Sequence, residues 1–212
     1  MQERDRWGGL PVGRREFVAG SLLALASIPS RTAAANAVIG AADEVRGMVS
    51  RKIGGTNAPI RAGADIMDRD FIITGEQSFA ALTLGSDTKL LLGSQTQLLV
   101  DSFIAGQGGT IELGTGRMIF DRPEGAPKLD LALRTAFGMI GVRGTKFFAG
   151  PNRGAFAVFV ERGAVDVTGG GVTRRVGAGE GIDIAAPGAA PGPVRRWGEA
   201  RIREAYESVG VR

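Results

Sequence analysis

Short apolar runs broken by glycine are the feature that most constrains the fold of this 212-residue chain. From Glu44 to about Ala185, these runs are about four to six residues long and recur about every eight to twelve residues. No part of this region keeps the apolar period of about 3.6 residues that an amphipathic helix requires. We therefore expect an all-β domain of short strands, meandering or solenoid-like.

The expected strands lie at residues 71–74, 80–84, 89–92, 97–100, 110–113, 117–120, 129–133, 145–148, 155–160, 164–167 and 181–184. Several of them carry apolar residues on both faces, which predicts strands that are covered on both sides. Turns are expected between them where glycine, serine and aspartate cluster, for example at residues 85–87.

The C-terminal part differs in composition from the strand region. Residues 186–194 are rich in proline, glycine and alanine, as in a linker. Residues 195–212 predict a short helix with an apolar stripe formed by Trp197, Ile202, Tyr206 and Val209. This helix either docks on the β domain or contacts a partner, and the sequence leaves both possibilities open.

The first 37 residues have the plan of a signal peptide. A polar segment ends in Arg14 and Arg15, an apolar run begins at Phe17, and small residues follow around Ala35 and Ala37. The Arg pair with Phe17 is typical of a twin-arginine signal, so we expect export to the periplasm. Cleavage after Ala37 leaves a mature chain from Val38 without a membrane span, and cleavage after Ala35 is the alternative.

Composition excludes several classes of function. Because the chain has no His and no Cys, it cannot form a Ser-His-Asp triad, a thiol nucleophile or the usual zinc sites. Between residues 38 and 194 basic and acidic residues are equal in number, without the excess of positive charge that nucleic-acid binding requires. We therefore expect no catalytic residues, no cofactor, no metal and no nucleic-acid partner. The expected domain occupies residues 38–185.

Two weaker patterns are better explained as turns. Ser86 to Lys89 matches the S-x-x-K string of penicillin-binding enzymes, but it bridges two expected strands and lacks the accompanying motifs. The acidic segment with Asp65, Asp68 and Asp70 has the wrong spacing for a calcium loop.

The most informative string runs from Phe137 to Phe148. It predicts a strand that ends near Gly141, followed by Arg143 and Gly144 at a junction with the next strand. Gly144 would permit positive φ or close backbone approach. Arg143 could either clamp a corner of the fold through its guanidinium donors or grip a carboxylate of a partner.

Val142, Arg143, Gly144, Thr145 and Phe147 together resemble the signature of the FecR domain, a periplasmic sensor module of iron signalling. Other strings follow in the family's order, namely 45–49, 60–66, 71–84, 90–100 and 160–165, so the resemblance spans about residues 44–184. It implies an all-β, solenoid-like domain that binds proteins and has no catalytic residues. Since few residues precede the apolar run, we expect a stand-alone exported member that lacks the cytoplasmic anti-sigma part.

The leading hypothesis is a non-enzymatic periplasmic module that binds an envelope or outer-membrane protein in signalling. The alternative is a module for cell-wall or surface polysaccharide. The mature chain offers Trp197 and Tyr206 only in its tail, which disfavours a sugar platform on the β domain. The sequence does not determine the partner, the sensed signal or the oligomeric state.

Overall fold

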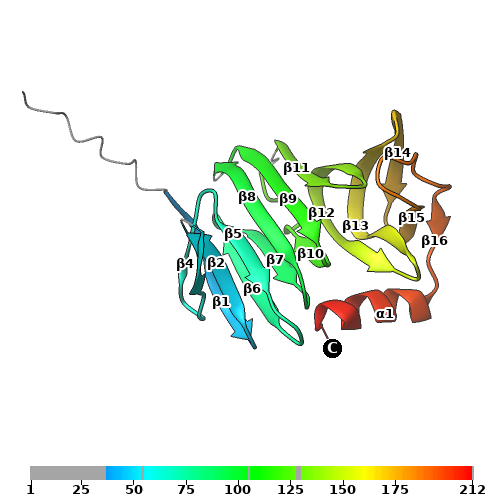
Figure 1. Ribbon diagram of the computed structural model, residues 1–212. Coiled ribbons are helices and arrows are strands. Elements are labelled where there is room, and N and C mark those ends of the chain that lie inside the picture. Colours follow the sequence, from blue (N-terminus) through cyan, green and yellow to red (C-terminus); the bar gives the residue numbers. More distant parts are fainter. Residues whose placement is uncertain (1–36, 54, 105, 128–129, 212) are drawn as a thin grey trace, which may run out of the picture. The chain divides into compact units, whose positions relative to one another are not determined.

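The computed structural model describes residues 37–53, 55–104, 106–127 and 130–211, except for the side chain of Arg143. These residues form an all-β domain with a short C-terminal helix, as predicted (Figure 1). The predicted export signal, with Arg14, Arg15, Phe17 and Ala35, lies outside the described residues. Ala37 is exposed and immediately precedes the first strand.

Sixteen strands form one hydrogen-bonded sheet, which we describe as two layers. Layer A contains, in spatial order, β3 (Thr56–Pro59), β2 (Val49–Ile53), β5 (Phe71–Thr74), β8 (Gln97–Ile104), β9 (Gly108–Thr115) and β11 (Asp130–Thr135). Layer B contains β10 (Met118–Asp121), β7 (Thr88–Leu92), β6 (Phe79–Leu84), β1 (Val38–Arg46) and β4 (Asp65–Met67). Among these ladders, β9 and β11 pair in parallel and the others pair antiparallel.

Two strands of 15 residues each, β12 (Gly138–Asn152) and β13 (Ala155–Gly169), belong to both layers. The first part of β12 pairs with β11 of layer A, and its later part pairs with β10 of layer B. Beyond β13, β14 (Val172–Gly177) continues layer A, while β15 (Glu180–Ile184) and β16 (Arg195–Arg196) continue layer B.

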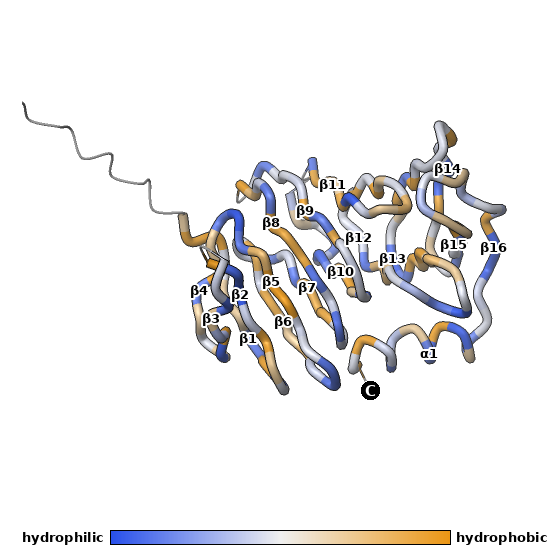
Figure 2. The backbone as a smooth tube through the Cα atoms, viewed as in Figure 1, coloured by the Kyte–Doolittle hydropathy of each residue, from blue (hydrophilic) through white to orange (hydrophobic). Residues whose placement is uncertain are grey.

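The main core lies between the two layers, because alternate side chains of each strand point inward. Leu98 and Ile111 of layer A and Leu82 and Phe120 of layer B are at most 1 % exposed and belong to one cluster. Figure 2 shows apolar residues in strands of both layers. The alternation in the sequence thus reports which side of each strand faces the core.

Along one side of the domain, tight turns carry the chain from one layer to the other. Neighbouring turns are joined through threonine side chains. The Thr74 hydroxyl donates to the Gly93 carbonyl at 2.5 Å and accepts from the Thr96 N–H at 2.8 Å. The Thr96 hydroxyl in turn accepts from the Arg117 N–H at 3.1 Å. These hydroxyls satisfy backbone groups that leave the sheet ladders at the turns.

Some element boundaries differ from the sequence prediction. The strands expected at 145–148, 155–160 and 164–167 are parts of the two long strands β12 and β13, because the bend between their halves does not end their pairing. Strand β14 was not predicted, since its sequence lacks apolar alternation. Helix α1 (Glu199–Val209) is shorter than the expected span of 195–212, because residues 195–196 form β16. Within the described residues, α1 is too short and too polar to cross a membrane.

Candidate interaction surface

The string from Val142 to Phe147 forms the bend at which the β12–β13 hairpin passes from layer A to layer B. Val142 and Phe147 point into the core, and Phe147 stacks on Phe120 with ring centroids 5.3 Å apart. The ladder between β12 and β13 shifts register between Arg143 and Phe147. Such a bulge bends a strand and increases its twist.

Two glycines make the bend possible. Gly144 has a φ of +54°, and Gly163 on the opposite strand has a φ of +81°. A Cβ atom on Gly163 would lie 2.8 Å from the carbonyl oxygen of Gly144, closer than side chains come in proteins. Val142, Thr145 and Phe147 are buried at this bend, and Gly144 adopts its left-handed backbone conformation. The side chain of Arg143 is not described, so its role stays a prediction.

A corner clamp of the kind considered for Arg143 is formed by Arg122, which is 3 % exposed. Its guanidinium contacts the carboxylate of Asp87, the hydroxyl of Thr88 at 2.8 Å and the carbonyl of Pro127 at 2.8 Å. Arg162 of β13 donates to the Arg122 carbonyl at 2.7 Å and to Asp121 at 2.8 Å. Sequence reasoning missed Arg122 because no motif contains it.

Helix α1 covers part of the outer face of layer B, over β10, β12 and β13. Ile119, Phe148, Ala157 and Phe159 are at most 2 % exposed, and Trp197, Ala205 and Val209 pack against them. Trp197 stacks on Phe159 with ring centroids 5.0 Å apart. The helix therefore docks on the β domain, one of the two possibilities that the sequence left open.

Polar contacts surround this apolar contact. Arg201 lies over the Trp197 ring and donates to Asp183 at 2.6 Å and to Asn152 at 2.8 Å. The Tyr206 hydroxyl donates to Glu161, which also pairs with Lys146 at 3.1 Å.

These contacts shift two pKa values. Burial alone would raise the pKa of Glu161, but the hydrogen bonds from Tyr206 and Lys146, with the nearby positive charges, bring it below its ordinary value. Burial and the adjacent Glu161 carboxylate raise the pKa of Tyr206.

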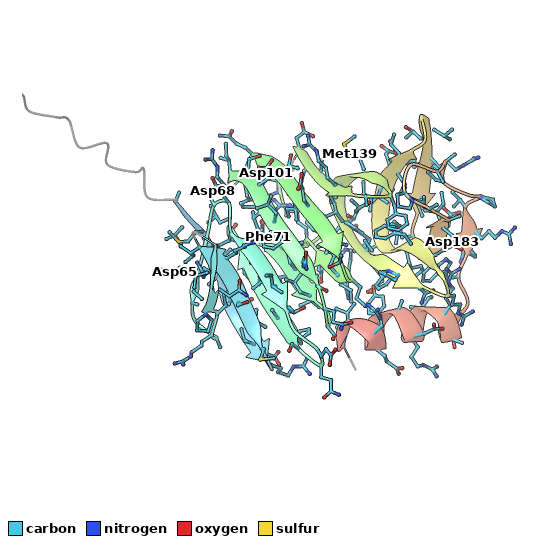
Figure 3. All side chains as sticks on the ribbon, in the orientation of Figure 1. Asp65, Asp68, Phe71, Asp101, Met139 and Asp183 are labelled. Carbon is cyan, nitrogen blue, oxygen red and sulfur yellow. The ribbon has the colours of Figure 1, made fainter. Side chains whose placement is uncertain are left out.

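The outer face of layer A contrasts with that of layer B, because its residues remain at least partly exposed. It carries small or short side chains at Thr110, Ala132, Gly141, Ala164 and Thr168. Larger apolar groups, Phe71, Ile73, Leu99 and Met139, lie among them, and Met139 is 44 % exposed. Figure 3 labels Phe71, Asp101 and Met139 of this layer.

The family model described as "FecR protein" matches residues 70–166, from the start of β5 into β13. Residues 70–166 match a FecR domain. The match includes the bend from Val142 to Phe147 and strands of both layers, while β1 to β4 precede it and β14, β15, the linker, β16 and α1 follow it. The resemblance seen in the sequence is thereby confirmed for this part of the chain.

Two solved structures of a "putative anti-sigma factor" from Parabacteroides distasonis are similar to this FecR-containing chain, each with a TM-score of 0.51 and 17 % identity. In each case the similarity covers 63 % of this chain and 62 % of the other chain. At this identity the comparison establishes a shared fold. No curated protein matches the chain.

A groove of about 560 Å³ at the turns that join the layers is lined by Thr74, Glu76, Ser94, Gln95 and Arg117, among others. Glu76 is the carboxylate in its lining, so the groove does not provide the paired carboxylates of a glycoside hydrolase. No group of three potential metal ligands occurs within the described residues.

The three aspartates near the start of the FecR domain have different surroundings. Asp70 is 6 % exposed, pairs with Arg51 at 2.9 Å and accepts from the Met67 N–H. Burial raises its pKa, although the Met67 N–H and Arg51 act in the opposite direction. Asp65 is exposed on strand β4, and Asp68 is partly exposed in the turn that follows (Figure 3). The solvated turn predicted for the acidic segment is therefore limited to residues 68–69.

Proposed function

We propose that this protein is a non-enzymatic, FecR-type signalling module that binds another protein in the periplasm. The proposal rests on the difference in exposure between the outer faces of the two layers. Helix α1 buries outer apolar residues of β10, β12 and β13 in layer B, while the outer face of layer A, built mostly within the residues that match the FecR model, stays at least partly exposed.

The chemistry of this face suits a protein partner better than a glycan. Phe71, Ile73 and Leu99 are partly exposed apolar groups on this face, and small side chains and the charged residues Glu112 and Arg134 lie beside them. Protein interfaces commonly combine such an apolar centre with a polar rim. The aromatic groups that a sugar platform would use are occupied, because Trp197 is 8 % exposed beneath Arg201 and Tyr206 bonds to Glu161.

In-host photo-cross-linking tests this function. A photoreactive phenylalanine would replace Thr110 or Thr168 on the outer face of layer A, and Arg203 on the exposed side of α1 as the matched control. We expect an adduct with one envelope protein from the two layer A positions and none from Arg203. Trp197 fluorescence of each purified variant verifies folding.

The opposite outcome is equally clear. If Thr110 and Thr168 variants that fold normally yield no protein adduct, or if glycan alone is recovered with them, the protein-binding function is wrong.

A further inference from the structure

Strand β14 forms the end of layer A with an edge that no described strand pairs. It pairs with β13 over six residues, and the hairpin closes through Gly170 and Gly171, both of which have positive φ. This is the pattern of a tight two-residue hairpin turn. Residues 172–175 are exposed. The backbone groups on the far side of β14 are therefore available to another strand.

The other terminal strands of the sheet are protected by features that β14 lacks. Strand β3 contains Pro59, β4 has three residues, and β16 has two. Proline and short length are common means by which proteins prevent edge-to-edge pairing. The linker lies beside the β13–β14 turn at Gly169 and Gly170, and the Pro191 carbonyl accepts from the Arg174 side chain at 3.0 Å. Among the described residues, no backbone hydrogen bond joins the linker to β14.

Charge at this end of the domain selects the kind of strand that fits. Arg174 and Arg175 lie on β14, and the two residues of β16, Arg195 and Arg196, are also exposed arginines. The carboxylate nearest to Arg175 belongs to Asp166 at 3.9 Å, and both side chains are largely exposed, so this pair is weak. Two copies of β14 placed edge to edge would bring like charges together, which disfavours self-association.

We propose that β14 is the docking edge for an extended, acidic segment of the protein partner, which adds as a further strand to layer A. This inference rests on the proposed protein-binding function and names the chemistry of the partner. Backbone hydrogen bonds would supply the pairing, and carboxylates opposite Arg175 would supply the selectivity.

Binding of synthetic peptides to the mature chain, residues 38–212, tests the proposal. The probes are a labelled eight-residue peptide of alternating valine and glutamate and its counterpart with lysine in place of glutamate. We expect the acidic peptide to bind at least about tenfold more tightly than the lysine peptide, and to bind more weakly as salt rises. Amide hydrogen exchange of residues 172–177 should slow when the acidic peptide is bound.

A charge-reversed variant sharpens the test. Arg175→Glu should lower the affinity for the acidic peptide at least about tenfold and raise the affinity for the lysine peptide. The control Arg203→Glu on α1 should change neither affinity. The proposal is overturned if the acidic peptide does not bind, if both peptides bind equally, or if residues 172–177 gain no protection. Hydrogen exchange on the unaltered chain decides the matter even if the variant misfolds. If one of these results is obtained but Thr110 or Thr168 still cross-links to a protein, the proposed protein-binding function is retained. In that case β14 is not the edge at which the partner binds.

Discussion

Arg122 illustrates what a single residue contributes to this domain. Its charge is almost fully removed from water, and Asp87, Thr88 and the Pro127 carbonyl compensate for that loss of hydration. Removing one member of such a buried set leaves the others without partners, which costs more than the interaction itself contributes. The clamp is therefore a point at which a conservative-looking change has a large effect.

We predict that Arg122→Met lowers the free energy of unfolding by about 3 kcal/mol. Methionine fills much of the same volume but leaves the Asp87 carboxylate, the Thr88 hydroxyl and the Pro127 carbonyl without donors. Chemical denaturation monitored by Trp197 fluorescence measures the change. Arg175→Met, which alters an exposed arginine, should cost less than about 1 kcal/mol. Equal effects of the two substitutions would show that Arg122 is not a clamp.

Residue-level reasoning from the sequence predicted a clamp at Arg143, which stays a prediction, and overlooked the clamp that Arg122 forms. Arg143 attracted attention because it stands in an apolar string beside glycine. Arg122 follows a strand and precedes Pro123, a context that is common in loops. Its burial depends on Asp87 and on the loop toward β11, which are distant in sequence, so local patterns carry no signal for it.

At the scale of elements, helix α1 behaves as a part of the domain whose attachment depends on pH. The Glu161 carboxylate must be ionised and the Tyr206 phenol protonated for their hydrogen bond to form. Because folding lowers the pKa of Glu161, its contribution is present above its ordinary pKa and is lost as the pH falls. Because folding raises the pKa of Tyr206, its contribution is present below about pH 10 and is lost as the pH rises further.

We predict that docking of α1 is strongest between about pH 5 and pH 10. In a chain of residues 38–212, which contains Trp197 but not Trp7, Trp197 fluorescence reports docking. Tyr206→Phe should remove the dependence above pH 10 and weaken docking by about 1 kcal/mol or less, since the pair is partly exposed. An unchanged alkaline profile in this variant would contradict the role of the Tyr206–Glu161 contact.

Element boundaries were predictable where apolar alternation is strong and were missed where pairing alone maintains a strand. Strands β5 to β9 lie close to their expected positions because each presents alternate apolar groups to the core. Strand β14 contains Thr173, Arg174 and Arg175 in succession and is held by backbone pairing to β13. The docked position of α1 also depends on the covered face of layer B, which no segment of the sequence reveals by itself.

At the scale of the whole molecule, the β12–β13 hairpin joins the two layers into one unit. The order of strands in the sheet could not be predicted from the sequence, because β12 reaches β11 in one layer and β10 in the other through a bend. A strand that belongs to both layers prevents either layer from unfolding independently. We therefore expect a single cooperative transition.

We predict that Gly163→Ala destabilises both layers together by about 2 kcal/mol, because it combines a positive φ with contact to the Gly144 carbonyl. Gly144 also has a positive φ but has open space where a Cβ atom would lie. Gly144→Ala should therefore lower the free energy of unfolding by about 1 kcal/mol. Trp197 fluorescence follows layer B, and exchange of β9 amides follows layer A. Separate transitions in the two signals would contradict the role of the hairpin as a shared element.

The shared hairpin also determines how the domain would carry mechanical load. Tension applied to β14 passes into β13. Both halves of β13 are hydrogen-bonded to β12 along most of their length, and the first half is also hydrogen-bonded to β15 in layer B. Hydrogen bonds loaded together along a ladder share the force, whereas bonds opened one after another fail at lower force. We therefore expect force applied at the β14 edge of layer A to reach the strands beneath α1 in layer B. This transfer should precede the separation of any strand of layer A from its neighbour.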